Sequence, residues 1–146
     1  MTYDYLKIIN TLREAFEKGD LDKGLSLHSQ DVIFWDVTLP EPLRGWQALR
    51  ESEEVWVRAF SDTKMELGKI VGLDRDVVVE WIMRATNTGP LQMGSDVIPA
   101  TGKRIELRGV MLGKLNAEGL IEERREYFDT GAFMTQLGLL PVAKVA

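Results

Sequence analysis

The chain has 146 residues, a formal net charge of −5, 45% hydrophobic and 28% charged residues, as in an ordinary soluble globular protein. This length predicts a single domain over residues 1–146. The acidic balance argues against a nucleic-acid partner, and no apolar run approaches the roughly 20 residues of a membrane span. With no cysteine and one histidine, we expect neither disulfides nor a metal site. The polar N-terminus does not resemble a signal peptide, so we expect a cytoplasmic location.

The N-terminal part of the chain predicts two helices. Apolar residues at helical spacing indicate a helix over residues 2–18, with Thr2 as its N-cap. A second, shorter helix is expected from Asp20 to His28. A lone histidine on an apolar helix face is more often a satisfied core residue than a catalytic one, and we interpret His28 in that way.

A short strand is expected over Val32–Val37, followed by a turn that Pro40 and Pro42 make rigid. Asp36 lies at the end of this strand, where its carboxylate either bonds turn amides or acts as a base in a cavity. The next helix is expected from Gly45 to about Ser61. Its buried side holds Trp46, Leu49, Trp56 and Phe60, and its largely outward residues include Glu51, Glu53 and Glu54.

From Lys64 onward the apolar pattern changes to the two-residue period of strands. Strands are expected over residues 65–71, 77–86 and 104–115, and Trp81 and Met83 share one apolar face of the second strand. Residues 87–102 contain glycine and proline without periodicity. We expect a loop there that gates a pocket and supplies no proton-transfer residue.

The stretch L-I-E-E-R-R-E-Y-F at residues 120–128 has strand composition but carries charges on both faces. Buried charges are tolerated only when they are paired or hydrated. The stretch therefore indicates either a polar cavity or an edge strand that is solvated on both sides.

The preceding strand, residues 104–115, indicates which face of this stretch turns inward. It alternates apolar residues with a charged ladder of Arg104, Glu106 and Arg108. Because opposite charges pair across neighbouring strands, the ladder predicts that Glu123 and Arg125 lie beside it on the outer face. The inner face would then hold Glu122, Arg124, Glu126 and Phe128. Bulges at Gly109 or Gly113 would shift this parity.

The predicted order is three helices with one strand inserted, then a meander of strands and a terminal helix, which is an α+β arrangement. Several motifs resemble the SnoaL-like polyketide cyclase branch of the nuclear transport factor 2-like and ketosteroid isomerase-like superfamily. They are D-V-I-F-W-D-V at residues 31–37, R-G at 44–45, A-T-G-K-R-I-E at 100–106, G-L-I-E-E-R-R-E-Y-F-D at 119–129 and Q-L-G-L at 136–139. The resemblance implies a cone-shaped, curved antiparallel or mixed sheet, three N-terminal helices over its concave face, a short C-terminal helix and a mostly apolar pocket.

The resemblance implies different catalytic positions for different enzyme groups. In SnoaL-type cyclases the acid/base of the last strand matches Glu126, and Arg124 stands where those enzymes normally have a histidine. In ketosteroid isomerases the base matches Asp36. Their two oxyanion donors match Leu12 and Met111, which cannot hydrogen-bond as required.

Limonene epoxide hydrolase-like enzymes supply a third comparison. Their water-activating acid matches Glu126, and their other water-holding residues match Phe34 and Asp36. Their relay falls near Trp81 and Met83, which we expect to be unable to donate or accept in that role.

Asp36 and Glu126 are therefore the candidate catalytic acid and base. Two acids in an apolar pocket should differ in proton affinity, which provides one acid and one base near neutral pH. Arg124 is the third candidate, and it either neutralises Glu126 or binds an anionic oxygen of a substrate. The other residues expected to line the pocket are Phe34, Trp56, Trp81, Met83, Ile105, Leu107, Met111 and Phe128.

The expected function is cyclase- or isomerase-type chemistry, without cofactor or metal, on a hydrophobic carbonyl-bearing small molecule. One alternative is a limonene epoxide hydrolase-like activity. The other is a non-catalytic binding or scaffold domain, in which Glu126 and Arg124 form a structural ion pair and Asp36 caps its turn. We also expect a homodimer through the outer sheet face, with reciprocal salt bridges from the charged residues of that face.

Overall fold

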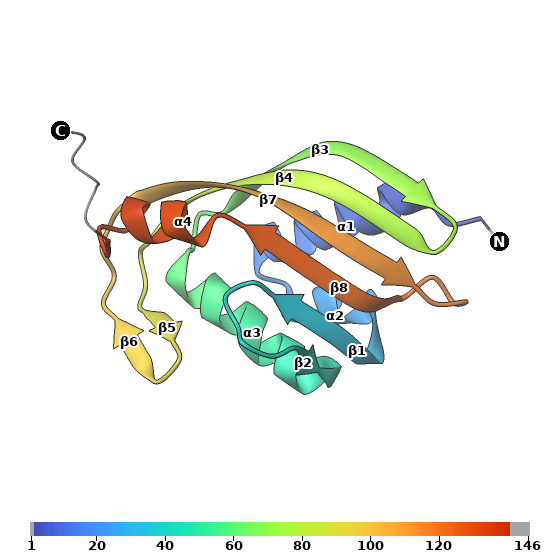
Figure 1. The fold of residues 1–146 in the computed structure, drawn as a ribbon, viewed down its shortest axis with the longest axis horizontal. Coiled ribbons are helices and arrows are strands. Elements are labelled where there is room, and N and C mark those ends of the chain that lie inside the picture. Colours follow the sequence, from blue (N-terminus) through green and yellow to red (C-terminus); the bar gives the residue numbers. More distant parts are fainter. Residues whose placement is uncertain (1, 141–146) are drawn as a thin grey trace.

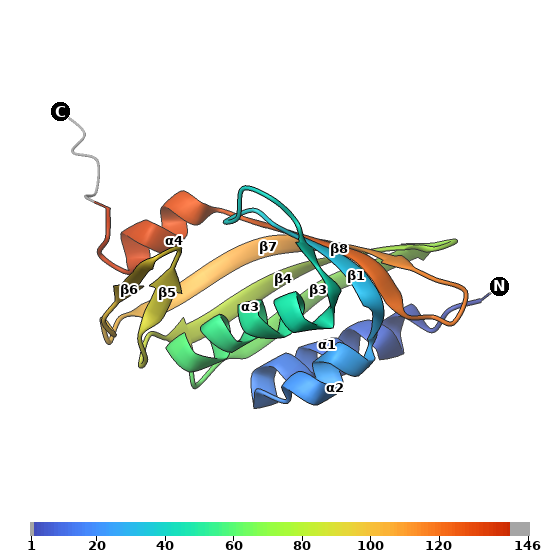
Figure 2. The same cartoon turned by 90° about the horizontal axis from the view of Figure 1, so that it is seen from below.

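The computed structural model describes residues 2–140, and it confirms the expected α+β class: helices pack on the concave side of a curved sheet (Figures 1 and 2). The elements are α1 (Tyr5–Lys18), α2 (Leu21–Ser26), β1 (His28–Asp36), β2 (Leu43–Arg44), α3 (Gly45–Ala59), β3 (Lys64–Leu73), β4 (Asp76–Thr86), β5 (Leu91–Met93), β6 (Asp96–Ile98), β7 (Arg104–Leu115), β8 (Ile121–Phe128) and α4 (Thr130–Gln136). The expected domain, residues 1–146, extends beyond the described residues at both ends. No described helix is long and apolar enough to cross a membrane.

The main sheet has six strands in the order β2-β1-β8-β7-β4-β3. All of its pairs are antiparallel except β1 and β8, which run parallel, so the sheet is mixed. These two strands are far apart in the sequence but lie side by side in the structure (Figure 1). Their register places Asp36 directly beside Glu126, so that both candidate acids lie at one place on the sheet.

The first two helices differ from the expectation at the N-cap of α1 and at the end of α2. Asp4, and not Thr2, caps α1, because its Oδ1 accepts a hydrogen bond of 3.0 Å from the amide of Lys7. In the same way, Asp20 caps α2, which ends at Ser26. The expected helix to His28 is therefore too long, and His28 begins β1.

The inner face of the sheet forms the core together with α1 and α3 (Figure 2). Alternate residues of β4 and β7 are buried, as the two-residue period predicts. They are Val77, Val79, Trp81, Met83 and Ala85 on β4, and Ile105, Leu107, Met111 and Leu115 on β7.

On the outer face, the expected pairing of β7 charges with β8 charges is wrong. Glu106 accepts a bond of 3.0 Å from Arg84 of β4, while Glu123 pairs at 2.6 Å with Arg125 of its own strand. The register explains the difference, since Arg125 lies opposite Leu112 and Glu123 lies opposite Lys114, so that neither faces a residue of the charged ladder. Arg124 and Glu126 nevertheless face inward, as expected.

A bulge at the start of β8 overturns the prediction for Glu122. Ile121 lies opposite Leu115 and is fully buried, and the pairing shifts before Lys114 meets Glu123. Glu122 is therefore turned away from the core, where it forms an ion pair with Arg75. The pairing continues in register at Gly109 and Gly113, where bulges were considered.

Residues 87–102 form a short hairpin, β5 and β6, and not the expected loop. Its base is anchored by the buried side chain of Asn87, which donates to the carbonyls of Ala59 and Gly89 at 3.2 and 3.0 Å. Asn87 also accepts from Thr101 at 2.8 Å. Strands of three residues are too short for the periodicity to reveal them.

Candidate active site

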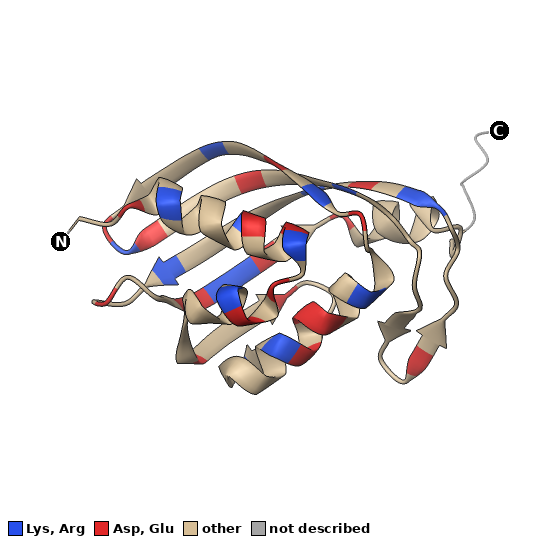
Figure 3. Ribbon diagram, turned by 180° about the vertical axis from the view of Figure 1, so that it is seen from behind, with Lys and Arg blue, Asp and Glu red and all other residues tan. Residues whose placement is uncertain are grey.

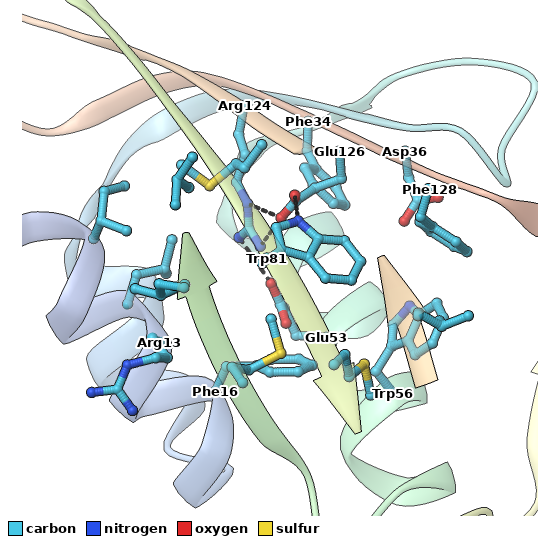
Figure 4. A pocket seen from close by; sticks show the side chains of 18 of the residues that line it. Arg13, Phe16, Phe34, Asp36, Glu53, Trp56, Trp81, Arg124, Glu126 and Phe128 are labelled. Atoms are coloured by element: carbon cyan, nitrogen blue, oxygen red, sulfur yellow. Dashed lines mark hydrogen bonds and ion pairs between the residues drawn. The ribbon is translucent and has the colours of Figure 1, made fainter. Parts of the chain in front are cut away.

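A cavity of about 100 Å³ lies between the concave face of the sheet and helices α1 and α3 (Figure 4). The expected lining residues that do line it are Phe34, Trp56, Trp81, Met83, Leu107, Met111 and Phe128. The lining that the sequence did not identify includes Ile9, Phe16, Ser52, Glu53, Met65, Leu67 and Val79. No residue of 87–102 lines the cavity, so nothing in its lining supports the expected gate.

Ile105 does not line the cavity, which corrects the sequence prediction. It is 1% exposed and lies opposite Ala85, toward the end of the sheet where α4 packs. At that end Gln136 of α4 accepts a bond of 2.6 Å from the amide of Glu106. The side chain has the predicted inward direction, but α4 closes the core over this end of the sheet.

Glu126 projects from β8 into the cavity, beside Met111 of the neighbouring strand. Its Oε2 accepts two hydrogen bonds from Arg124, at 3.0 Å from Nε and 2.7 Å from Nη2. Its Oε1 accepts a third bond, at 3.1 Å, from Nε1 of Trp81 (Figure 4). Burial raises the pKa of Glu126 above its ordinary value, and the negative charge of Glu53 adds to this, although Arg124 and Trp81 act in the opposite direction.

Arg124 lies between two carboxylates. Its Nη1 donates to Oε1 of Glu53 at 3.0 Å, while Nε and Nη2 donate to Glu126. Its guanidinium also lies 5.0 Å from the centroid of the Phe34 ring. Burial opposes the charge, but Glu126 and Glu53 outweigh it and raise the pKa of Arg124 above its ordinary value, so the residue stays cationic. Of the two roles considered for Arg124, this geometry fits the neutralisation of Glu126.

Glu53 is a site residue that the sequence analysis wrongly placed outside. It lies on α3, where the acidic segments of the ribbon lie between two basic ones (Figure 3), and its side chain is 17% exposed. The spacing from Leu49 to Glu53 and Trp56 is four and then three residues, which puts all three on one helix face. This spacing could have identified Glu53, since both of its neighbours on the face were predicted to be buried.

His28 lies behind Arg124 and does not line the main cavity. It is 1% exposed, and its Nδ1 donates to the carbonyl of Gly24 at 2.8 Å. Burial, together with the nearby charge of Arg124, lowers the pKa of His28 to about 3. The residue is thus a neutral member of the core, in agreement with the preferred interpretation.

Asp36 both caps its turn and lines the cavity, so the two interpretations of this residue are compatible. Its Oδ1 accepts hydrogen bonds from the amide and hydroxyl of Thr38, at 2.7 and 2.5 Å. The residue is only 8% exposed, and it lies beside Glu126 on the adjacent parallel strand.

Trp81 is held in place by a glycine on the neighbouring strand. Gly109 lies opposite it in the β4–β7 pair, and a Cβ on Gly109 would overlap the indole ring. The close approach lets the ring lie flat in the cavity wall with its N–H toward Glu126. Trp81 thus contributes a hydrogen-bond donor to the cavity, which the sequence analysis did not anticipate.

In the described part of the chain, no group of three or more histidine or acidic residues could hold a metal ion. The polar groups that lie together in the cavity are instead an arginine that bridges two carboxylates, an indole N–H and a third carboxylate. Such a set is suited to proton transfer and to hydrogen bonding.

Comparison with known proteins agrees with the expected family. The model of the SnoaL-like polyketide cyclase family matches residues 7–137. Among solved structures, AclR from Streptomyces galilaeus is 20% identical with a TM-score of 0.80, over 94% of this chain and 98% of that one. A SnoaL-like protein of Jannaschia Sp. CCS1 is 17% identical with a TM-score of 0.81, over 94% and 93%.

A third similar structure is a protein of Mycobacterium tuberculosis in complex with estradiol-17β-hemisuccinate, which is 16% identical with a TM-score of 0.70, over 90% of this chain and 98% of that one. No curated protein matches the chain. The structural likeness establishes the fold, and the family model covers most of the described residues. The chain therefore belongs to the SnoaL-like polyketide cyclase family.

Proposed function

We propose that the protein performs cyclase- or isomerase-type acid–base chemistry on a hydrophobic, carbonyl-bearing small molecule, without a cofactor. Glu126 and Asp36 are the proposed proton-transfer groups. The observation that carries the proposal is the position of Glu126, whose carboxyl group is buried in an apolar cavity beside a second acid. Burial raises the pKa of Glu126 above its ordinary value, which is the direction in which enzymes shift carboxyl groups that serve as general acids or bases.

The charges around Arg124 support a functional role for Glu126 over a purely structural one. A structural ion pair requires one carboxylate, but Arg124 is bonded to both Glu53 and Glu126. One arginine cannot neutralise two carboxylates in a site of low polarity, so one acid retains a raised affinity for a proton. The desolvated member with the raised pKa is Glu126.

Glu126 also keeps the capacity to act on a ligand. An ionised carboxylate has about four lone-pair sites. Three of these accept the bonds from Arg124 and Trp81, which leaves one on Oε1. As the base, Glu126 would take a proton from a carbon next to the substrate carbonyl, and Asp36 would serve as the second proton carrier.

A hydrophobic substrate fits the walls of the cavity, which are mostly apolar and aromatic. The similar protein of Mycobacterium tuberculosis was solved with estradiol-17β-hemisuccinate, which joins an apolar ring system to a succinate group, and its ring system supports a hydrophobic ligand here.

The proposal is tested by replacing each acid with its amide. Glu126→Gln keeps the size of the side chain but removes the titratable proton, and turnover should fall by ~10²–10⁴-fold while affinity stays within a few-fold. Asp36→Asn should lower turnover comparably if the acids act as a pair, and the double variant should be little worse than either single one. Full turnover in Glu126→Gln would falsify the mechanism.

The second candidate is a non-catalytic binding domain on the same fold. It is favoured by the three hydrogen bonds that already satisfy Glu126 and by the turn that Asp36 caps. In that case Asp36→Asn would cost roughly 1 kcal/mol of stability or less, and ligands would bind without being converted. No observation favours an epoxide hydrolase over these two, since Met83 stands at one of its relay positions as an apolar wall residue.

A further inference from the structure

Arg124 is the buried arginine of the cavity, but its donors already face protein acceptors. Nε and Nη2 donate to Glu126, and Nη1 donates to Glu53. Nη1 also lies 3.4 Å from Nε2 of His28, which is an acceptor because the Nδ1–H of that ring donates to a carbonyl. With Phe34 against its face, the guanidinium is enclosed, and an anionic ligand would have to displace one of these partners.

The other arginine of the lining does not offer an anion site either. Arg13 forms an ion pair of 3.1 Å with Glu17, one helical turn away, and approaches Glu14 at 3.6 Å. Its guanidinium points away from the cavity (Figure 4). Within the described residues that line the cavity, no cation is thus free to receive a carboxylate or phosphate.

The acids of the lining, in contrast, keep open acceptor positions. Asp36 receives its bonds on Oδ1, and Glu53 receives its bond on Oε1. The second oxygen of each carboxylate has no hydrogen bond from any described residue. Asp36 is nine-tenths buried and has no arginine or lysine partner among the described ion pairs, so a cation that entered the cavity would be its first ion-pair partner.

Aromatic rings complete this environment. The ring of Phe128 lies between those of Trp56 and Trp81, at centroid distances of 5.9 and 6.1 Å. None of the three has a cationic side chain over its face in the described part of the chain. Rings of this kind bind ammonium groups, and they do so more strongly where water is excluded.

We infer that this cavity selects a ligand in which a protonated amine is attached to an apolar frame, and that it discriminates against carboxylates of the same shape. The inference rests on the proposed function in taking the same cavity as the substrate site. It adds the charge of the substrate: Asp36 and the open oxygen of Glu53 would receive the ammonium group, and the aromatic walls would receive the frame.

Three probes of one shape test the inference: 2-phenylethylamine, 2-phenylethanol and phenylacetate, which are cationic, neutral and anionic at pH 7. Binding is measured on the full chain through the indole N–H signals of Trp56 and Trp81 in NMR titrations. We expect the amine to bind at least about tenfold more tightly than phenylacetate, with the alcohol between them. Equal binding of the three, tightest binding of phenylacetate, or binding of none in the millimolar range would overturn the inference.

Matched variants locate the effect. Asp36→Asn removes the carboxylate charge but keeps an acceptor for Thr38. Glu53→Gln removes the carboxylate charge that pairs with Arg124. Each variant should reduce the preference for the amine severalfold and leave the affinity for the alcohol unchanged. Glu51→Gln removes an equal charge from an exposed position of α3 and should change nothing. An unchanged preference in both cavity variants would overturn the inference. Because no turnover is measured, this result is independent of the Glu126→Gln test of the proposed function.

Discussion

At the scale of single residues, the proton affinity of Glu126 depends on the few donors that reach it. Burial and Glu53 raise the pKa of Glu126, whereas Arg124 and the indole N–H of Trp81 stabilise its ionised form. The balance among these neighbours, more than the carboxyl group itself, sets the pH range in which Glu126 can exchange a proton.

Trp81→Phe removes one of these donors and keeps an aromatic ring. Because the lost N–H favoured the carboxylate, we expect the pKa of Glu126 to rise further in this variant. The measurement is a ¹³C NMR titration of the Glu126 carboxyl carbon. Trp46→Phe is the control, since the Trp46 indole donates to the carbonyl of His28 and does not line the main cavity. A lower pKa in Trp81→Phe would contradict the assigned role.

His28 should make stability depend on pH. Its pKa is lowered from 6.5 to about 3 in the folded state, so between these values the unfolded chain binds a proton that the folded chain does not. The free energy of unfolding therefore falls as the pH drops from 6.5 to about 3, with a slope of about 1.4 kcal/mol per pH unit. Above pH 6.5 His28 is neutral in both states and causes no loss of stability. Urea unfolding at several pH values should show a flatter dependence for His28→Asn, and an unchanged slope would refute the buried neutral state.

At the scale of elements, the site depends on how closely β4 and β7 approach. Gly109 leaves the space that the Trp81 ring fills, and both residues lie in the middle of the longest antiparallel pair of the sheet. The position of the Trp81 N–H is therefore a property of two strands and not of Trp81 alone.

Gly109→Ala should disturb the site without changing any polar group. The added methyl group overlaps the Trp81 ring, so we expect a loss of about 1–3 kcal/mol in unfolding free energy and a displaced indole N–H signal. Gly24→Ala provides the matched control, because a Cβ on this helical glycine meets no other atom. Equal stability of the two variants would mean that the ring moves aside freely.

At the scale of the whole molecule, the outer face of the sheet carries an apolar row in addition to its charges. Trp35 of β1, Leu112 of β7, Val78 of β4 and Val71 of β3 are exposed and lie in one line across the sheet, with Arg125 of β8 between Trp35 and Leu112. Most charges of this face are already paired within the chain, as in Arg84 with Glu106. We therefore expect a dimer through this face to be held by the apolar row more than by the reciprocal salt bridges that the sequence suggested.

Val78→Glu should separate such a dimer, because it places a charge in the row between Leu112 and Val71, where no cation lies directly opposite it. Sedimentation at micromolar concentration and physiological salt should show a two-fold assembly for the native chain and a monomer for the variant. Leu6→Glu changes an exposed leucine of α1 and serves as the control. A monomeric native chain would rule out the dimer.

Much of the fold could be predicted because its signals are local. The period of β7 gave the bounds Arg104–Leu115 and the inward direction of Leu107 and Met111. Asp36 and Glu126 were identified through the family motifs and do line one cavity. Prediction from the sequence failed where one residue changes a local rule, as at the cap Asp4, or where distant elements meet, as in the hydrogen bond from Trp81 to Glu126. Contacts between segments far apart in sequence leave no periodic trace in either one.

The parallel pairing of β1 with β8 has a consequence for how the chain folds. These are the first and last strands of the described sheet, and β1 pairs otherwise only with the two residues of β2. During synthesis, one edge of β1 must therefore remain unpaired until β8 has left the ribosome, a long-range closure of the kind that folds slowly. The pocket is assembled at that last step, and until then the chain presents a strand edge on which aggregation or chaperone binding can begin.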